Sequence, residues 1–450
     1  MSDRDRADAV YEALLSRAGE RWVQPRKERV ARILAFLDDP QKTYRVVHIT
    51  GTNGKTSTAR MIESLLRAHD LRTGLFTSPH LERFTERIMI DGEPISDAAV
   101  ADAWDEIEPF VGIVDAELEA AGDAPLTFFE LLTVLAFVAV ADAPVDVLVL
   151  EVGMGGAWDS TNTADGDVAV FAPIDIDHAD RLGGTIAQIA EVKAGIIKEG
   201  AAVVSARQSA DAAAVLRRVA AEKNATIAFE GEDFGLEAQT LAVGGQLITV
   251  RGLAGTYAEQ YLPLYGAHQG HNAALAVAAV ESLIGGATQP IAGEVVTDGL
   301  QSATSPGRLQ LLGIAPTVIV DAAHNPHGAQ ALVQAMGDSF DFDEWGVVLG
   351  VLADKDAAGI VARLAPASAH VFATAPDSER AGDADVLADL VEATGHRATV
   401  HPTLAEAADA AREWAASSER RAVVIAGSVV LAGSAIALAE EEDWKSGWRA

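Results

Sequence analysis

A glycine-rich turn inside the stretch from Val46 to Arg60, VVHITGTNGKTSTAR, most constrains the fold of this chain. An apolar run leads into the turn, and apolar residues at i, i+3 and i+4 spacing follow it, as in a helix. The turn is shorter than the common phosphate loop, G-x-x-x-x-G-K-[ST], because Ile49 stands where that loop has its first glycine. An ordinary glycine turn would not need Lys55 and Thr56 together. We therefore predict that backbone N–H groups, Lys55 and a hydroxyl hold nucleotide phosphates and Mg²⁺ here.

Apolar runs alternate with helical patterns in two parts of the chain, which predicts an α/β fold. The runs are continuously apolar, as in parallel strands covered on both faces. Beyond the first run, they lie at 73–78, 145–153, 168–174, 317–326, 345–356, 369–376, 398–403 and 421–428. Polar strand-like pieces such as QLITVRG and the helical pattern HNAALAVAAVESLI lie between the two parts. We predict a large parallel-sheet ATPase domain of the phosphate-loop type at 1–300, a linker at 301–309 and a smaller Rossmann-like domain at 310–450.

Composition excludes several classes of protein. The net charge of −32 argues against a general nucleic-acid surface. No run approaches the ~18 apolar residues of a membrane helix, and the charged start MSDRDRADAVYEALL lacks the apolar centre of a signal peptide. We therefore expect a cytoplasmic protein with neither a nucleic-acid nor a membrane partner. Zero cysteines exclude disulfides and thiol catalysis, so oxygen or imidazole groups must hold any metal.

Three residues near the expected carboxyl ends of strands are candidate metal ligands. Ser78 lies in FTSPH, Glu151 ends VLVLE and His178 ends IDIDH. In open α/β sheets these strand ends face the ligand crevice, and a carboxylate directly after the four apolar residues VLVL is costly without a cation. Ser78 and Glu151 carry the oxygen ligands that Mg²⁺ prefers. The alternatives are a helix-capping or hydrogen-bonding carboxylate for Glu151 and a loop histidine for His178.

Four further residues are candidates because of their surroundings. Lys193 lies among small and apolar residues in IAEVKAGIIKEG, so it is either solvated on a helix face or chemically special. A buried amine is easily neutralised, and near a metal it can add CO₂ to form a carbamate. Asp321 and His324 follow another apolar run, where they can meet the ribose or adenine side and the γ-phosphate. Arg308, in the break TSPGRLQ, can move onto phosphates when two domains close.

Seven short motifs together resemble the folylpolyglutamate synthase/dihydrofolate synthase family, within the Mur ligase superfamily. Any one motif is weak to moderate, but their order along nearly the whole chain is specific. In chain order they are GTNGKTS, TSPHL, EVGMGG, DIDH, KAGI, SPGR and DAAHNP. The resemblance implies a central ATP-binding domain with pterin-binding segments and a C-terminal glutamate-ligase domain, with ATP between them.

The resemblance also implies roles for single residues. Nucleotide contacts are implied for Asn53, Gly54, Lys55, Thr56, Asn272, Arg308 and Asp321. Ser78 and Glu151 would bind one Mg²⁺, and His178 and a carbamylated Lys193 would bind a second. Lys55, Lys193 and His324 would be catalytic. Pterin contacts are implied for Arg26, Lys27, Glu28, Arg29, Thr127, Phe128, Phe129, Glu130 and Asp159.

The chain departs from the family pattern at three places. Ala157 stands where many relatives have arginine, a change that bears on the pteridine contacts. Val192 directly precedes Lys193, whereas glutamate is common there and Glu191 lies one place earlier. Ala322 replaces the usual glycine of DGAHNP. The last two changes concern supporting geometry more than chemistry.

The resemblance implies what the γ-phosphate is used for. It would pass to a substrate carboxylate, and the amino group of L-glutamate would attack the acyl phosphate. The acceptor would be dihydropteroate or a reduced folate, and ATP would be the co-substrate. The enzyme would be a monomer that binds two Mg²⁺ ions, with a monovalent cation as a further possible ligand. One rival is a Mur-type ligase of cell-wall precursors, although TSPHL and DAAHNP are folate-type and we expect no uridine-binding domain before residue 44. The other is a non-ligase nucleotide switch, which would need neither DAAHNP nor the metal ligands.

Overall fold

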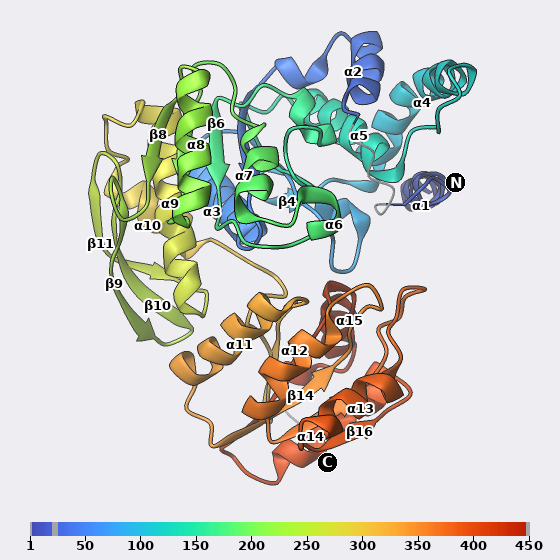
Figure 1. The fold of residues 1–450 in the computed structure, drawn as a ribbon, viewed down its shortest axis with the longest axis vertical. Helices are drawn as coiled ribbons and strands as arrows, with labels where there is room; N and C mark the ends of the chain where they lie inside the picture. The colour runs from blue at the N-terminus through green and yellow to red at the C-terminus, as the bar shows by residue number, and fades with distance from the viewer. Residues whose placement is uncertain (1, 20–25, 447–450) are drawn as a thin grey trace.

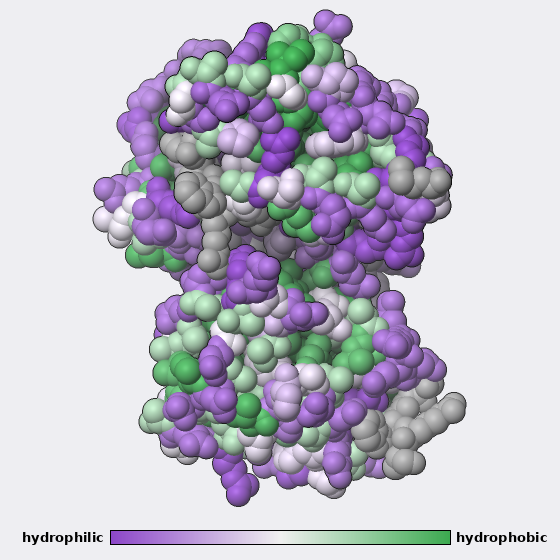
Figure 2. Space-filling model, turned by 90° about the vertical axis from the view of Figure 1, so that its right-hand side faces the viewer, coloured by the Kyte–Doolittle hydropathy of each residue, from purple (hydrophilic) through white to green (hydrophobic). Residues whose placement is uncertain are grey.

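The computed structural model describes residues 2–19 and 26–446. The chain forms a larger and a smaller body joined at a narrower waist (Figures 1 and 2). We call the described residues up to 301 the N-terminal lobe and residues 310–446 the C-terminal lobe. No helix in these described ranges is long and apolar enough to cross a bilayer.

An eight-stranded sheet forms the centre of the N-terminal lobe, in the order β4-β3-β2-β5-β1-β6-β7-β8. Strand β1 (Arg45–Thr50) is central and pairs in parallel with β5 and β6. Only β3 and β4, at one edge, pair antiparallel. The remaining strands are β2 (Thr73–Phe76), β3 (Ile88–Ile90), β4 (Glu93–Pro94), β5 (Val147–Glu151), β6 (Val168–Phe171), β7 (Ala202–Ser205) and β8 (Thr226–Phe229).

Both faces of this sheet are covered, which explains why its strands read as continuous apolar runs. Val47 and Ile49 pack on the side of α3 and α9, whereas Val46 and Leu148 pack on the side of α4 and α5. Helix α3 (Lys55–Ala68) lies against α9 (Ala267–Gly285) and is buried nearly all round. The other helices of the lobe are α1 (Asp3–Leu15), α2 (Glu28–Leu34), α4 (Asp97–Ala120), α5 (Phe128–Asp142), α6 (Ala179–Leu182), α7 (Ile186–Ala194), α8 (Ala210–Glu222) and α10 (Gly293–Gln301).

The polar strand-like pieces of the middle section form a separate antiparallel sheet of β9 (Gly235–Ala242), β10 (Gly245–Arg251) and β11 (Thr256–Leu262). The sheet lies at the side of the lobe next to α9 and α10 (Figure 1). Buried Glu281 of α9 accepts hydrogen bonds from the Tyr257 hydroxyl at 2.7 Å and from the backbone N–H groups of Ala254 and Gly255 at 3.1 Å. This carboxylate therefore anchors the small sheet to the helix.

The C-terminal lobe is built on a six-stranded sheet in the order β12-β13-β17-β14-β15-β16, parallel except for β12. The α/β prediction for both lobes is therefore confirmed. The strands are β12 (Gln310–Ile314), β13 (Thr317–Val320), β14 (Glu344–Leu349), β15 (His370–Ala373), β16 (Ala398–Val400) and β17 (Arg421–Ala426). The helices are α11 (Pro326–Ser339), α12 (Ala357–Leu364), α13 (Ala384–Ala393), α14 (Leu404–Ala416) and α15 (Val429–Glu441).

The transition between the lobes lies between two elements. Helix α10 packs on α3 and ends at Gln301, and β12 begins the second sheet at Gln310. The predicted boundaries at 300 and 310 lie close to these two points, but as limits of independent domains they stay a prediction.

Candidate active site

The phosphate-loop prediction falls on the turn between β1 and α3. Strand β1 ends at Thr50 and α3 begins at Lys55. Gly54 has a φ of +84°, and a Cβ there would lie 2.8 Å from Oδ1 of Asn272 in α9. A Cβ on Gly51 would lie 2.7 Å from Cβ of Ala172. Both glycines are required because other parts of the chain press the turn against the helix N-terminus.

A small cavity of about 30 Å³, open to solvent, lies at this turn. Lys55 lines it, and among the residues that the structure describes its ammonium makes one hydrogen bond, of 3.3 Å to the Thr52 carbonyl. It can therefore turn towards a ligand. The segments 50–52 and 152–155 also line it, together with Asp177, His178, Leu182 and Lys193. The structure thus brings Lys55, His178 and Lys193 to one cavity, and their roles there stay predictions.

Glu151 is the last residue of β5, as predicted, and its side chain is only 1% exposed. The Thr56 hydroxyl lies 3.0 Å from both carboxylate oxygens. Burial raises the pKa of Glu151, although the positive charge of Lys55, the Thr56 hydroxyl and the Ser78 backbone N–H oppose that shift. The buried carboxylate, with the Thr56 hydroxyl and the backbone of Ser78 beside it, offers hard oxygen donors of the kind that Mg²⁺ prefers.

Lys193 is buried in α7, so the alternative of a solvated lysine is wrong. Its side chain is 4% exposed, and Nζ donates a 2.9 Å hydrogen bond to the Gly51 carbonyl. Burial, together with the positive charge of Lys55, lowers the pKa of Lys193 to about 7. The amine therefore exists in part as the neutral nucleophile at neutral pH.

The prediction that His178 ends a strand is wrong, although the residue does reach the cavity. Strand β6 ends at Phe171, and His178 precedes the short helix α6 with a φ of +48°. The intervening segment stays beside the phosphate loop because the Thr52 N–H donates to the Pro173 carbonyl at 2.8 Å. Burial lowers the pKa of the His178 imidazole, which leaves it neutral and able to bind a metal.

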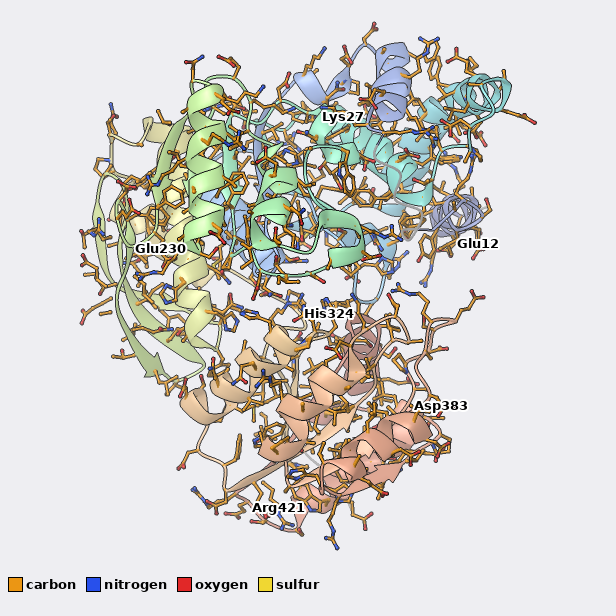
Figure 3. The ribbon with its side chains drawn as sticks, viewed as in Figure 1. Glu12, Lys27, Glu230, His324, Asp383 and Arg421 are labelled. Carbon is orange, nitrogen blue, oxygen red and sulfur yellow. The ribbon has the colours of Figure 1, made fainter. Side chains whose placement is uncertain are left out.

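The C-terminal lobe presents Asp321 and His324 to this region from the end of β13. Asp321 is 9% exposed and accepts the N–H groups of Leu309 at 3.0 Å and Ala323 at 2.8 Å. Burial raises its pKa, and the positive charge of Arg308 opposes that shift. The His324 Nδ1 lies 2.9 Å from the Ala322 carbonyl and burial lowers its pKa to about 4, so Nδ1–H is the donor and Nε2 is left as an acceptor. Figure 3 shows His324 at the face that meets the N-terminal lobe.

Direct contacts at the phosphate loop and the start of α3 reach the C-terminal lobe and the segment that connects the two lobes. The Asn53 Nδ2 donates a 2.8 Å hydrogen bond to Nδ1 of His327 in α11. The hydroxyls of Ser57 and Ser305 lie 2.8 Å apart. Sequence reasoning missed His327, whose only signal was a second histidine three residues after His324.

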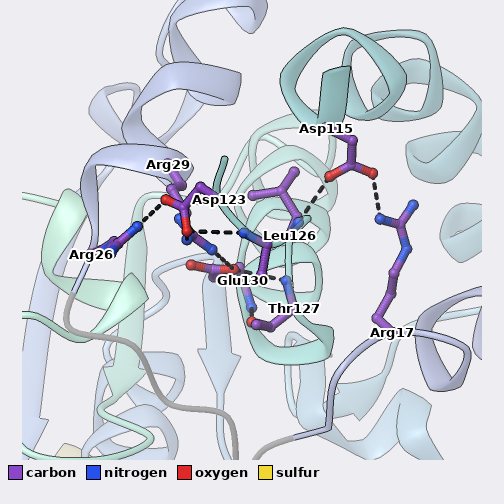
Figure 4. A network of polar contacts seen from close by, with 9 residues as sticks. Arg17, Arg26, Arg29, Asp115, Asp123, Leu126, Thr127 and Glu130 are labelled. Atoms are coloured by element: carbon purple, nitrogen blue, oxygen red, sulfur yellow. Dashed lines mark hydrogen bonds and ion pairs between the residues drawn. The ribbon is translucent and has the colours of Figure 1, made fainter. Parts of the chain in front are cut away.

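Most of the predicted pterin residues are engaged within the protein (Figure 4). The Arg29 side chain is 4% exposed, and its guanidinium lies 2.5 Å from the Asp123 carboxylate and 3.9 Å from that of Glu130. Thr127 and Glu130 cap α5 reciprocally, with the Thr127 N–H 2.7 Å from the Glu130 carboxylate. Arg26 also pairs with Asp123. We call Arg26, Arg29, Asp123, Thr127 and Glu130 the Arg29 network; in this structure it joins α2 to the start of α5.

The remaining predicted pterin residues differ in their surroundings. Lys27 and Glu28 lie at the start of α2, and Figure 3 shows Lys27 far from His324. Phe128 is 4% exposed, and the Phe129 ring lies 6.0 Å from that of Phe76. Pterin binding by these residues stays a prediction.

Asp159 is buried and holds its own loop together. It accepts hydrogen bonds from the Met154 N–H at 2.9 Å, the Thr161 N–H at 3.0 Å and the Thr161 hydroxyl at 2.5 Å. Burial raises its pKa. Asp159 therefore shapes the 153–161 segment that borders the cavity, whereas a direct contact with pterin stays a prediction.

Within the described ranges, no three or more histidine and acidic side chains cluster to hold a metal by themselves. The predicted sites do not require such a cluster, because each combines one protein carboxylate or imidazole with a hydroxyl or a modified lysine. A nucleotide phosphate would supply further oxygen ligands.

Comparisons with known proteins agree with this geometry. The Mur ligase middle domain matches residues 49–280, and the glutamate ligase domain of Mur ligases matches residues 307–429. The dihydrofolate synthase/folylpolyglutamate synthase of Mycobacterium tuberculosis is 44% identical over 92% of this chain and 91% of its own. The folylpolyglutamate synthase of Lacticaseibacillus casei is 38% identical over 76% of this chain and 79% of its own.

Solved structures extend the likeness to the fold. The folylpolyglutamate synthase of Mycobacterium tuberculosis complexed with ADP superposes with a TM-score of 0.92 at 42% identity, covering 97% of this chain and 99% of that one. Escherichia coli FolC in complex with DHPP and ADP superposes with a TM-score of 0.83 at 30% identity, covering 97% and 98%. With both Mur ligase domains and these relatives over nearly its whole length, the chain belongs to the dihydrofolate synthase/folylpolyglutamate synthase family.

Proposed function

We propose that the chain is an ATP-dependent ligase that adds L-glutamate to dihydropteroate, to reduced folates or to both. The observation that carries the proposal is the juxtaposition of a phosphate loop with a buried carboxylate. Lys55, the first residue of α3, lines the cavity, and the next residue, Thr56, meets buried Glu151. Relatives of this chain bind ADP, and one binds ADP together with DHPP.

The first step is the activation of a carboxylate. An oxygen of the acceptor carboxylate attacks the γ-phosphorus of ATP, the bond to the β–γ bridging oxygen breaks, and ADP leaves. Lys55, the α3 N-terminus and Arg308 hold the phosphates and offset the charge that accumulates on them. His324 lies opposite, with a neutral imidazole whose Nε2 can accept a hydrogen bond.

The second step forms the amide. The uncharged amino group of L-glutamate attacks the acyl phosphate carbon, a tetrahedral intermediate forms, and phosphate leaves with the C–O electron pair while the nitrogen loses a proton. Water would compete for the acyl phosphate. Closure of the lobes, which the Asn53–His327 hydrogen bond joins, would exclude it.

Metal ions belong to the proposal as bound cofactors. Ser78 and Glu151 would hold one Mg²⁺, and His178 and a carbamylated Lys193 would hold a second. When bound, Mg²⁺ supplies positive charge beside the phosphates. The buried carboxylate beside Thr56 and the neutral amine of Lys193 support this assignment. A monovalent cation, a monomeric state and a cytoplasmic location stay predictions.

The deciding experiment measures ADP release with Mg-ATP and L-glutamate. Dihydropteroate, tetrahydrofolate and a UDP-muramoyl precursor are added separately. Stimulation by both pterins supports a bifunctional folate enzyme, and stimulation by one assigns a single activity. Stimulation by the muramoyl compound alone, or by none of the three, contradicts the proposal.

A further inference from the structure

Arg60 occupies an unusual position on α3. Every side chain from Ser57 to Leu66 is buried except that of Arg60, which is partly exposed. The helix is enclosed by the central sheet, α9 and α10. Arg60 is thus the one partly exposed residue in a stretch of α3 whose other residues, from Ser57 to Leu66, are buried.

The carboxylates around Arg60 are committed to other groups. Glu86 accepts the backbone N–H groups of residues 81–83 at 2.6–3.0 Å. Glu63 accepts the Thr73 hydroxyl at 2.6 Å and pairs with Arg67 at 3.1 Å, and Glu151 is bonded to Thr56. Across residues 2–19 and 26–446, no hydrogen bond or ion pair reaches the Arg60 side chain, although Glu86, Glu63, Glu151 and Arg308 all act on its charge.

The direction of Arg60 follows from helix geometry. Residues at i and i+4 lie on one face, so Arg60 stands one turn beyond Thr56 and on its side. Helical side chains lean towards the helix N-terminus, which turns Arg60 to the sheet edge where Thr56 meets Glu151. Its charge is also close to that of Arg308, a like charge that disfavours the arrangement unless an anion lies there.

We propose that Arg60 binds a carboxylate of the glutamate portion of the reaction, either on the incoming L-glutamate or on a folate tail. The inference rests on the proposed ligase function. The planar guanidinium fork matches a carboxylate bidentately. Lys55 and the helix N-terminus already offer positive charge to the phosphates. Arg60 lies about 6 Å further along the helix axis than Thr56, so we assign it to a different anion.

The test compares Arg60→Gln and Arg60→Lys with the matched control Arg67→Gln on the same helix, whose partner is Glu63. We expect Arg60→Gln to raise a KM for L-glutamate or for tetrahydrofolate by about 10- to 100-fold, with a smaller change in kcat. Lysine keeps the charge but loses the fork, so it should restore part of the affinity. Arg67→Gln should leave all KM values within about twofold, as expected for a partly exposed ion pair.

The substrate arms separate the sources of the carboxylate. A raised KM for L-glutamate with every acceptor assigns the free amino acid, whereas a raised KM for tetrahydrofolate but not for tail-free dihydropteroate assigns the folate tail. Both outcomes support the proposal. A raised KM for ATP alone, or unchanged values for all substrates, overturns it while the ligase function stands. A wild-type chain without acceptor-dependent ADP release would remove both.

Discussion

The phosphate-loop region and the Arg29 network both carry buried charges, but they use them differently. Around the loop, Lys55 has one long hydrogen bond and Lys193 one backbone carbonyl, and Arg60 has no hydrogen-bond partner in the described ranges. In the Arg29 network, arginine and carboxylate meet directly and the carboxylates also cap backbone N–H groups. The first region leaves charge for a ligand to neutralise, whereas the second neutralises its own.

The family resemblance implied ligand contacts in both regions: nucleotide contacts at the phosphate loop and pterin contacts in the Arg29 network. The geometry favours direct ligand binding at the loop, and at the network it favours the joining of α2 to α5. A charge that is paired within the protein can still contact a substrate. Variants are therefore needed to show whether losing a residue lowers the affinity for substrate or the free energy of unfolding.

The largest effect is expected from Lys193→Ala. If this lysine is held for chemistry, the variant should lose about 100- to 1,000-fold in kcat without a loss of stability, because an unneutralised buried amine is itself costly. ADP release measures kcat, and thermal unfolding measures stability. The intact wild-type protein should have the mass of one added CO₂. An active alanine variant, or an unmodified lysine in the active enzyme, would show that Lys193 has a structural role.

The pH dependence gives the same residue a second test. The lowered pKa of about 7 means that the folded chain gives up the Lys193 proton above neutrality, while the unfolded chain keeps it to about 10.5. The neutral amine is the form that adds CO₂, so CO₂ uptake should increase as the pH passes through 7. Folding stability should also increase with pH above 7. Trapping of labelled CO₂ at several pH values measures the first effect, and a flat profile from pH 6 to 8 would contradict it.

Glu151→Gln should have the next largest effect. The amide keeps the shape and can still meet Thr56, but it loses the negative charge that suits Mg²⁺. We expect a loss of about 10- to 100-fold in turnover or a raised Mg²⁺ requirement. ADP release titrated against Mg²⁺ provides the measurement. Unchanged Mg²⁺ dependence would place Glu151 with the structural carboxylates.

Arg29→Met should affect folding and not nucleotide binding. It leaves buried Glu130 without its cation, whereas Asp123 keeps Arg26. Breaking the buried Arg29–Glu130 pair costs about 3 kcal/mol. Urea unfolding measures that cost, and the KM for ATP should not change. A rise in the KM for dihydropteroate, with stability retained, would show instead that the network contacts pterin. The control is Arg32→Gln, because Arg32 forms an exposed ion pair with Glu117.

His327→Ala should have the smallest effect. It removes one exposed hydrogen bond between the lobes, worth about 1 kcal/mol. We expect a change of no more than about tenfold in ADP affinity, measured by calorimetry. A larger loss would mean that His327 touches the nucleotide itself.

Local patterns predicted the strands and helices well because burial on both faces leaves a clear apolar signature. The run YRVVHIT became β1, and VDVLVLEVG became β5 with Glu151 at its end. The order of the strands was not predictable, since it depends on contacts between distant segments. The edge pair β3 and β4 has only three and two residues, too few for a periodic signal.

The site was predictable where a motif coincides with a strand end and less so where tertiary packing decides. His178 was placed on a strand, but the backbone contact between Thr52 and Pro173 brings it to the cavity from a loop. The burial of Lys193 and the isolation of Arg60 come from neighbours that no local pattern reveals. His327 was missed because its partner, Asn53, lies in the other lobe.

The way Asn272 and Ala172 press on the glycine turn has a consequence for protein synthesis. The loop sequence leaves the ribosome early, yet the residue that confines Gly54 is made much later. We expect the turn to stay pliable on the nascent chain until α9 has emerged and packed against α3. Nucleotide would then stabilise the first half of the chain very little while that half folds. Stabilisation by bound nucleotide would begin only when translation is well past the middle of the message.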